Sequence, residues 1–465
     1  MTALLAQLSA AQRRAAARLG AAFARRGHAL YLVGGPVRDL LLGQTPADLD
    51  FATDAAPAAI RAAAEAAGAD AVYTANERFA TVGARVEGEA LEITTFRGAA
   101  GGDPLGGLRA DLALRDFTIN AMALPLAADA APIDPFDGRG DLARRTIRAT
   151  GDPAARFAED PLRALRAARF AAQFGFAIEP DTRVAVAAFA PRVAAVSAER
   201  VGAEWTRLLA APHVADGLRL AERLGLLAAT LPEVAPLAEF SAAGSKDLWL
   251  HTLQVVARTP ARPAARWAAL LHDVAKPRTF DATGGEVHFF GHEALGARIA
   301  RKTLRRLKFD RETIEAVARL VELHGRPAQY DETWTDGAVR RLMLEVGPHL
   351  DDLLDLARAD VTSARADVQR RARARIGALA ARCARLQEEE ELARLQSPLD
   401  GNALMALFAR PPGPWIRPLK DYLRDLVIDG DLAPGDTARA RDLALAWMAA
   451  HGDQAAPPGR RDGNS

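Results

Sequence analysis

The sequence contains a single cysteine, Cys383, among its 465 residues. One cysteine has no internal disulfide partner, which fits the reducing conditions of the cytoplasm. No stretch reaches the roughly 18 uncharged apolar residues of a membrane span, and the N-terminal residues lack the basic segment of a secretory signal. We therefore expect a cytoplasmic protein with no membrane partner, and the sequence leaves its oligomeric state open.

The sequence also lacks a large net charge, because 60 basic residues balance 59 acidic ones to give a net charge of +1. A nucleic-acid partner would have to be bound by local positive charge. Such charge occurs in residues 363–387, which hold seven arginines against one acid, Asp367. The segment fits a phosphate-contacting helix, and it equally fits a solvated helix beside the acidic run at 388–391. The arginines are Arg365, Arg370, Arg371, Arg373, Arg375, Arg382 and Arg385.

The hydrophobic pattern divides the chain into a mixed part and a helical part. Short apolar runs predict strands over the first 125 residues, with helices between them, whereas nearly everything after residue 140 has a helical pattern. The length suggests about three domains at roughly 150 residues each. The sequence thus predicts an α+β fold, with a mixed α/β head and an all-α remainder. The expected boundaries are 1–145 for the head, 146–240 for a helical neck, 241–365 for a second helical domain and 366–465 for a helical tail with the basic helix. The expected strands are 30–33, 49–52, 71–74, 80–86 and 90–95.

The strongest local signal is a glycine turn followed by two carboxylates. Gly34 and Gly35 follow a short apolar run and precede a helix that carries Arg38. A bare turn at a helix N-terminus suits a triphosphate, and Arg38 can add a charge-assisted bond to it. Asp48 and Asp50 then follow, and residues two apart on a strand face the same way.

Two neighbouring carboxylates repel each other unless a cation lies between them. Paired hard oxygen ligands suit Mg²⁺ that also binds substrate phosphates. Glu92 alternates correctly on a later strand to supply a third carboxylate beside Asp48 and Asp50. These three residues are the candidate catalytic and magnesium-binding set; the alternative for the aspartates is a helix cap or turn.

Four motifs in order resemble the bacterial class II tRNA nucleotidyltransferase and poly(A) polymerase family. They are Leu32–Asp39, Asp48–Asp50, Arg115–Ala121 and Glu159–Arg163. The resemblance covers residues 30 to 210 and implies a nucleotidyltransferase head followed by helical neck, body and tail. It implies a tRNA 3′ end as one partner, and CTP and ATP as the nucleotides.

The resemblance assigns Arg115, Asp116 and Asn120 to contacts with the sugar and phosphates. Arg115 offers a planar fork for phosphate oxygens, and the other two can bond ribose hydroxyls. The alternative is a structural ion pair with a cap.

The resemblance assigns the choice of nucleotide to Asp160 and Arg163. Residues three apart share a helix face, so the two side chains are expected to form one edge. A carboxylate accepts from the amino group of cytosine or adenine, and a guanidinium donates to the ring nitrogen. Arg166 and Arg169 continue this face and resemble further nucleotide contacts. The segment around Glu204 is expected to be scaffold, and an ordinary helix ion pair is the alternative for Asp160 and Arg163.

A second candidate metal site lies in the helical part. The segment 270–277 resembles the core of an HD domain, which implies a divalent metal and phosphate-ester hydrolysis. Imidazoles beside carboxylates suit such a metal; the alternative is that these residues only pack or cap. The candidate ligands are His251, His272, Asp273 and Asp360, with His292 and His324 able to complete a larger site.

The connection over 98–114 is short and rich in glycine. Within the family, such shortening resembles enzymes that add only two cytidines, so CCA addition and CC addition remain rivals. Poly(A) polymerase is less expected, because the long basic tail of that branch is missing. An HD phosphohydrolase with an inactive head and a non-catalytic RNA-binding protein are the remaining alternatives.

Overall fold

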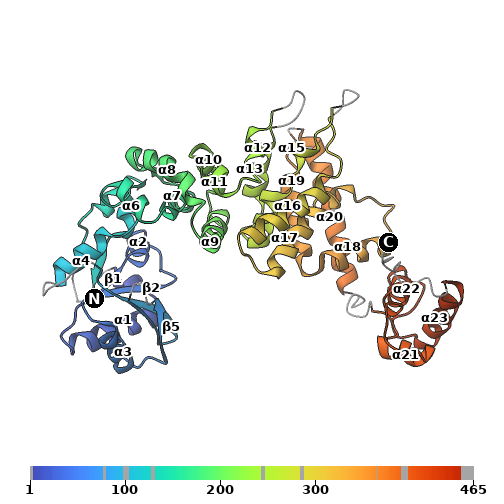
Figure 1. Ribbon diagram of the computed structural model, residues 1–465, viewed down its shortest axis with the longest axis horizontal. Coiled ribbons are helices and arrows are strands. Elements are labelled where there is room, and N and C mark those ends of the chain that lie inside the picture. The colour runs from blue at the N-terminus through green and yellow to red at the C-terminus, as the bar shows by residue number, and fades with distance from the viewer. Residues whose placement is uncertain are drawn as a thin grey trace, which may run out of the picture. The chain divides into compact units, whose positions relative to one another are not determined.

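The computed structural model describes residues 4–76, 80–97, 104–126, 131–241, 247–282, 287–363, 365–388 and 396–451 (Figure 1). The chain forms two compact units. The N-terminal unit comprises residues 1–239 with 306–309, and the C-terminal unit comprises 240–305 with 310–465. The N-terminal unit holds a six-stranded sheet and the C-terminal unit is helical, which confirms the predicted α+β class.

The sheet runs in the order β3-β4-β5-β2-β1-β6. Only β2 and β5 pair in parallel, while the other neighbours are antiparallel. The strands that were predicted from apolar runs are all present. Their bounds are β1 Leu30–Val33, β2 Leu49–Thr53, β3 Ala71–Asn76, β4 Thr81–Val86, β5 Glu89–Thr95 and β6 Ala123–Pro125.

Helices cover the sheet. Helices α1 (Ala10–Ala24) and α3 (Pro57–Ala66) pack against each other and against the strands. Ser9 and Gln12 exchange side-chain and backbone hydrogen bonds and so start α1 with a capping box. Helix α4 (Pro104–Ala113) buries Leu108 and Leu112 against β1, β2 and β6. Short helices α2 (Gly35–Leu41), η2 (Thr118–Asn120) and α5 (Gly138–Ala143) follow strands or turns of the head.

The helical neck is built around α7 (Leu162–Phe174), which packs against α8 (Pro180–Val193), α9 (Ala198–Leu209) and α10 (Val214–Arg223). Helix α7 ends at Gly175, whose φ of 65° reverses the chain. A short parallel pair, β7 (Thr146–Ile147) and β8 (Ala177–Ile178), ties the entry of the neck to the residues after α7. The remaining neck helices are α6 (Pro153–Glu159), α11 (Leu226–Thr230) and α12 (Pro236–Glu239).

The C-terminal unit surrounds α14 (Pro263–Leu271), whose residues 265–271 are all buried. It packs against α13 (Leu248–Arg258), α17 (Arg311–Leu323) and α19 (Leu350–Asp360). The other members are α15 (Lys276–Thr279), α16 (His292–Arg306), η3 (Pro327–Gln329), α18 (Asp336–Val346), η4 (Gly347–His349) and the basic helix α20 (Ala366–Glu388).

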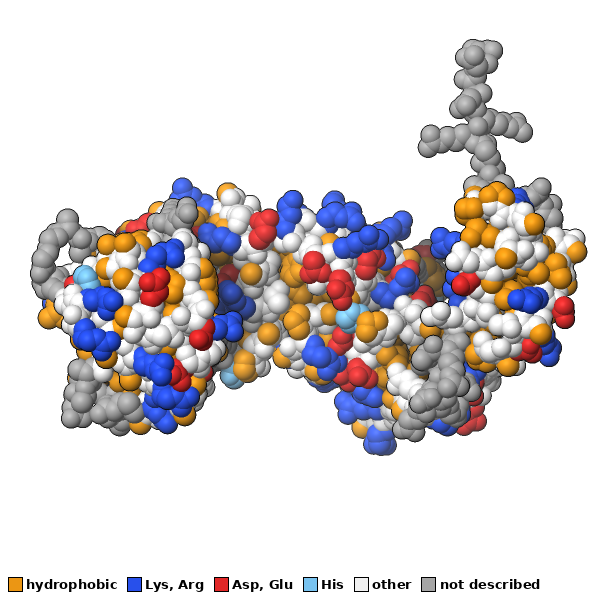
Figure 2. Space-filling view, turned by 90° about the horizontal axis from the view of Figure 1, so that it is seen from below, with side chains coloured by type: hydrophobic (Ala, Val, Ile, Leu, Met, Phe, Trp, Pro, Cys, Tyr) orange, Lys and Arg blue, Asp and Glu red, His pale blue; other side chains and the backbone are white. Residues whose placement is uncertain are grey.

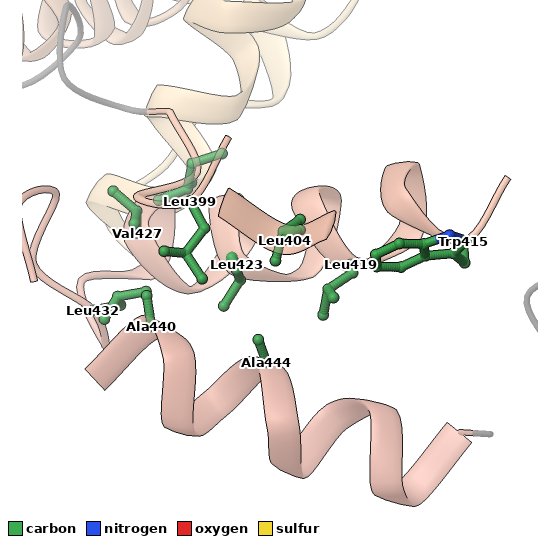
Figure 3. Packing of buried hydrophobic residues seen from close by; sticks show 10 residues of the cluster. Leu399, Leu404, Trp415, Leu419, Leu423, Val427, Leu432, Ala440 and Ala444 are labelled. Atoms are coloured by element: carbon green, nitrogen blue, oxygen red, sulfur yellow. The ribbon is translucent and has the colours of Figure 1, made fainter. Parts of the chain in front are cut away.

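Three further helices, α21 (Gly401–Phe408), α22 (Ile416–Asp429) and α23 (Thr437–His451), share a small core. Leu404, Leu419 and Leu423 point toward one another from α21 and α22, and Ala444 of α23 faces them (Figure 3). This cluster is separate from the core around α14, and α22 also contacts α18.

Basic and acidic side chains are interspersed on the face seen in Figure 2. This agrees with the net charge of +1. Among the described residues, no helix combines the length and the apolar composition that a membrane crossing requires.

Candidate functional site

Three carboxylates meet at the centre of the sheet. The parallel pairing of β2 with β5 places Asp50 opposite Glu92, so the two side chains leave the sheet on the same face. Asp48 is exposed and lies just before β2, which begins at Leu49. Burial raises the pKa of Asp50, Arg115 opposes the rise, and Glu92 and Asp48 add to it, so that the pKa is about 6. Such crowded negative charge is what a bound cation neutralises, so these residues fit a divalent metal.

Arg115 lies close enough to Asp50 to oppose the rise in its pKa, and Gly34 lies against Arg115. Gly34 has a φ of 77°, and any Cβ there would collide with Arg115 Nη1. The guanidinium of Arg115 therefore lies against the glycine turn, where only a bare backbone fits. Its Nε is buried without a hydrogen-bond partner among the described residues, which leaves a donor for a ligand.

Asp111 forms an ion pair with Arg115. The sequence pattern did not predict a role for Asp111. It is buried at the end of α4, accepts a bond from Arg97 Nε at 2.7 Å and lies 3.4 Å from Arg115 Nη2. The expected connection over 98–114 is thus helical from Pro104, while 98–103 lie outside the described residues.

Arg38 is committed to protein partners. Its Nη1 donates to Asn120 Oδ1 at 2.6 Å, its Nη2 lies 2.7 Å from Asp39 Oδ1, and its guanidinium stacks over Phe174. The structure thus shows Arg38 holding Asn120 in place, and its contact with a triphosphate stays a prediction. Gly35 opens the helix that carries Arg38.

Asp116 is a buried carboxylate that hydrogen bonds hold from several sides. Its Oδ1 accepts from Asn120 Nδ2 at 3.0 Å and from the Phe117 amide at 2.8 Å. Its Oδ2 accepts two bonds from Arg166, at 2.7 and 2.8 Å. Burial favours the neutral form, but Arg166 and these hydrogen bonds outweigh it and lower the pKa of Asp116 to about 2.

Glu204 extends this chain of bonds, and the sequence interpretation treated its segment only as scaffold. Its carboxylate accepts from Arg169 Nε at 2.6 Å and from Arg166 Nη1 at 3.3 Å. Burial lowers the pKa of Arg169 to about 10, and Glu204 opposes that change. The signal was available, because Glu204 shares a helix face with Val201 and Leu208, where a lone acid needs a basic partner.

Asp160 and Arg163 are not on one continuous helix, which corrects the expectation. Helix α6 ends at Glu159, and Asp160 is extended because the following proline disfavours the helical conformation. Asp160 Oδ2 accepts from Arg200 Nη2 at 2.5 Å, whereas Arg163 bonds Glu159 at 3.0 Å and the Leu114 carbonyl at 2.8 Å. The two side chains are therefore neighbours in a turn with separate partners.

A second cluster lies in the C-terminal unit, as the sequence predicted. The candidate ligand atoms fall in two groups, each with all atoms within 4.8 Å of one another. The first group is His251, His272 and Asp360, and the second is Asp273, His292 and His324. Asp273 joins the groups, since its Oδ2 is 3.2 Å from His272 Nε2 and its Oδ1 is 3.6 Å from His292 Nε2.

The imidazoles are oriented by bonds at their other nitrogen. The Nδ1 atoms of His272, His292 and His324 lie 2.7–2.8 Å from the backbone carbonyls of Ala269, Phe289 and Val321. A nitrogen that faces a carbonyl carries the proton, which leaves the Nε2 lone pair for a metal. Asp273 Oδ1 is buried without a hydrogen-bond partner among the described residues. The donor set therefore fits one or two divalent metals.

The basic helix α20 is partly explained by structure. Arg382 and Arg385 both bond Asp336, at 2.7 and 3.1 Å, and Arg375 donates to the Ala328 carbonyl. Ion pairing within the fold thus accounts for part of the charge that suggested RNA contact.

Comparison with known proteins decides the family. Residues 30–148 match the family described as "Poly A polymerase head domain", 175–237 match "Probable RNA and SrmB- binding site of polymerase A", and 248–365 match "HD domain". The A-adding tRNA nucleotidyltransferase of Deinococcus radiodurans is 34% identical over 425 residues, which cover 88% of this chain and 94% of the relative. The chain belongs to the tRNA nucleotidyltransferase family.

Other members of the family share nearly the whole chain. The CCA-adding enzyme of Geobacillus thermodenitrificans is 32% identical, with 91% of this chain and 93% of the relative covered. The CC-adding tRNA nucleotidyltransferase of Thermus thermophilus is 34% identical, with 91% and 94% covered. The Bacillus stearothermophilus CCA-adding enzyme, solved in complex with CTP, matches with a TM-score of 0.66 and 26% identity over 95% of this chain and 99% of that one. The predicted resemblance, the enzyme class and the HD domain are thereby confirmed.

Proposed function

We propose that this nucleotidyltransferase adds C, C and A to the 3′ end of tRNA from CTP and ATP. The observation that carries the proposal is the register of Asp50 with Glu92 beside Asp48, with Arg115 close enough to Asp50 to lower its pKa and Gly34 against Arg115. Three carboxylates thus lie near one guanidinium, whose Nε has no hydrogen-bond partner among the described residues. That combination suits a triphosphate bound with divalent metal.

In the proposed reaction, the 3′ oxygen of the RNA forms a bond with the α-phosphorus, and the bond to the β-phosphate oxygen breaks. Asp48, Asp50 and Glu92 would hold Mg²⁺, which would supply an acidified 3′ hydroxyl and charge stabilisation for the leaving pyrophosphate. The hydroxyl proton is released to solvent. Arg115 neutralises the triphosphate, and Asp111 keeps its guanidinium against Gly34. Asp116 and Asn120 hold the ribose side of the site, fixed by Arg38 and Arg166.

Asp160 and Arg163 are proposed to select the base. They would exchange Arg200 and Glu159 for the amino group and ring nitrogen of the incoming nucleotide. Guanine and uracil would leave the carboxylate facing a carbonyl, at a cost of about 1–3 kcal/mol. Because cytosine and adenine offer the same pair of groups, this chemistry favours an enzyme that accepts both. The A-adding, CCA-adding and CC-adding relatives are similarly distant, so similarity alone does not choose among them.

The test is nucleotide addition to tRNA that ends before, within or after the two cytidines, with CTP, ATP or both. We expect two C and then one A, read at single-nucleotide resolution. Addition of C alone, or of A only to tRNA that already carries both cytidines, would contradict CCA addition and leave the transferase intact. Glu92→Gln should abolish extension, while Glu89→Gln on the same strand should not. Extension by Glu92→Gln at the normal rate would remove Glu92 from the metal-binding set.

A second activity is favoured by the oriented imidazoles and by the buried Asp273 oxygen, which has no hydrogen-bond partner in the described part of the chain. We propose that this HD cluster binds divalent metal and hydrolyses phosphate esters. Asp360→Asn should lower the metal content measured by mass spectrometry and abolish hydrolysis of a phosphomonoester. Asp351→Asn, exposed on the same helix, is the control and should keep both. The proposal would be overturned if the purified wild-type protein contained no metal and hydrolysed no phosphomonoester after addition of Mg²⁺, Mn²⁺ or Ni²⁺.

A further inference from the structure

A phenylalanine is left on the surface beside the HD cluster. The side chain of Phe290 is 74% exposed, more than any other large apolar side chain among the described residues. Its ring stacks on His288, with centroids 4.9 Å apart and planes inclined by 17°. Neighbouring aromatic rings do the opposite: Phe240, Phe280 and Phe289 pack against one another. Phe290 is therefore exposed and contacts His288, whereas the three neighbouring phenylalanines are partly buried against one another.

This pair lies close in the chain to the candidate metal ligands. Phe290 precedes the candidate ligand His292 by two residues, so their Cα atoms lie within about 7.6 Å. Gly291, with a φ of 71°, turns the chain between them. The Phe289 carbonyl holds His292 Nδ1 at 2.8 Å, and the Phe289 ring lies 5.4 Å from Lys276 Nζ. Lys276 in turn bonds Asp273 at 2.6 Å.

The other side of the pair is anchored by backbone. His288 and Asp281 exchange two hydrogen bonds, at 2.8 and 2.9 Å, in an antiparallel bridge. The stack is thus attached on one side to this bridge and on the other to the first residue of α16. An exposed aromatic pair close in the chain to a cluster that is proposed to bind phosphate can bind both parts of a nucleotide. The ring can stack on the base, and the cluster can hold the phosphate.

We propose that Phe290 and His288 form a base-stacking subsite for the substrate of the HD cluster, which is therefore a nucleotide or an RNA end with a phosphate ester. This inference rests on the proposed hydrolase. The base lies on the Phe290 ring, and the phosphate reaches the cluster near Lys276. In the reaction, the oxygen of a water molecule bonds to phosphorus and the bond between phosphorus and the ribose oxygen breaks. The ribose oxygen takes one proton of that water and leaves as a hydroxyl.

The first test measures binding without catalysis in the full-length protein. In Phe290→Trp, adenosine 5′-monophosphate should quench the added fluorescence, after subtraction of the signal of the wild-type protein, whereas base-free ribose 5-phosphate should not. Leu445→Trp, which places the probe at another exposed site, should be quenched by neither. Equal quenching by both ligands, or by neither, at position 290 would overturn the subsite.

The second test separates the subsite from the hydrolase. Phe290→Ala should raise the KM for adenosine 5′-monophosphate between about fivefold and a hundredfold with kcat unchanged, as loss of one stacked base predicts. Hydrolysis of ribose 5-phosphate should not change, and Phe290→Tyr should restore the KM. Equal losses on both substrates would overturn base stacking. Selective quenching in Phe290→Trp without hydrolysis by the wild-type protein would support the subsite and overturn the hydrolase.

Discussion

At the scale of single residues, the N-terminal unit is held by charges buried in a chain of bonds. Asp116 and Glu204 are both buried, and Arg166 bonds both of them. An isolated charge at such depth would cost several kcal/mol, so each of these groups depends on its partners. The same chain of bonds continues from Asp116 to Asn120 and from Asn120 to Arg38.

The depressed pKa of Asp116 makes this arrangement sensitive to pH. Its folded pKa is about 2 against an ordinary 3.8, so its stabilisation is fully present above pH 4 and is lost as pH falls toward 2. The shift corresponds to about 2 kcal/mol. In urea unfolding, the gap in free energy between wild type and Asp116→Asn should shrink from pH 5 to pH 3. Asp216→Asn, at a 75% exposed side chain, should show a small gap that stays constant. A constant gap for Asp116→Asn would contradict the ion pair.

A pair of glycine variants separates two roles of Gly34, its backbone conformation and the space that it leaves for Arg115. Gly34→Ala meets both a φ of 77° and Arg115, whereas Gly27→Ala meets a φ of 76° with nothing within 4 Å. Gly27→Ala should lose about 1–2 kcal/mol of stability because of its positive φ. Gly34→Ala should lose more, because its backbone is at φ 77° and ψ −132° and its Cβ meets Arg115. Only Gly34→Ala displaces the guanidinium, so only it should raise the KM for CTP, by about tenfold or more. Equal KM values in the two variants would show that Arg115 does not contact the nucleotide in this way.

At the scale of elements, the sequence predicted strands better than helix ends. Leu30–Val33 was predicted with its true bounds because an apolar run meets a glycine turn there. Helix α4 was missed because its sequence contains two glycines and little amphipathic pattern; its burial against β1 and β2 stabilises it instead. The break at Asp160 was visible in Pro161, yet the helical pattern on both sides concealed it.

The three C-terminal helices offer a direct test of their small core. Leu423 is fully buried between α21, α22 and α23, so Leu423→Ala should destabilise this bundle by about 2–5 kcal/mol. Hydrogen exchange should then accelerate at the amides of α22 and stay unchanged in α7. Leu445→Ala removes the same atoms from a side chain that is 47% exposed and should change neither. Faster exchange throughout the protein would mean that the bundle unfolds only together with the rest.

At the scale of the whole molecule, the candidate sites differ in how far the sequence determined them. The carboxylates were predictable because β2 and β5 each carry their own pattern, and the HD ligands because a short motif marks them. The apolar helix face around Glu204 indicated that it needs a basic partner, but not that the partner is Arg169, 35 residues earlier. Asp111 was missed because its partner Arg97 lies 14 residues before it. Bonds of that kind depend on how helices pack, which periodicity alone does not give.

The division into two compact units predicts two separable activities in the intact chain. The sheet carboxylates belong to the N-terminal unit and the HD cluster to the C-terminal unit, and each unit has its own core. Asp50→Asn should therefore abolish nucleotide addition and leave phosphomonoester hydrolysis and metal bound at the HD cluster unchanged. Asp273→Asn should do the reverse, since it removes a ligand shared by both groups of the cluster. Both activities should be measured on the same preparation of each full-length variant. If Asp273→Asn lowered nucleotide addition in proportion to hydrolysis while unfolding in urea stayed normal, one centre would be acting through the other.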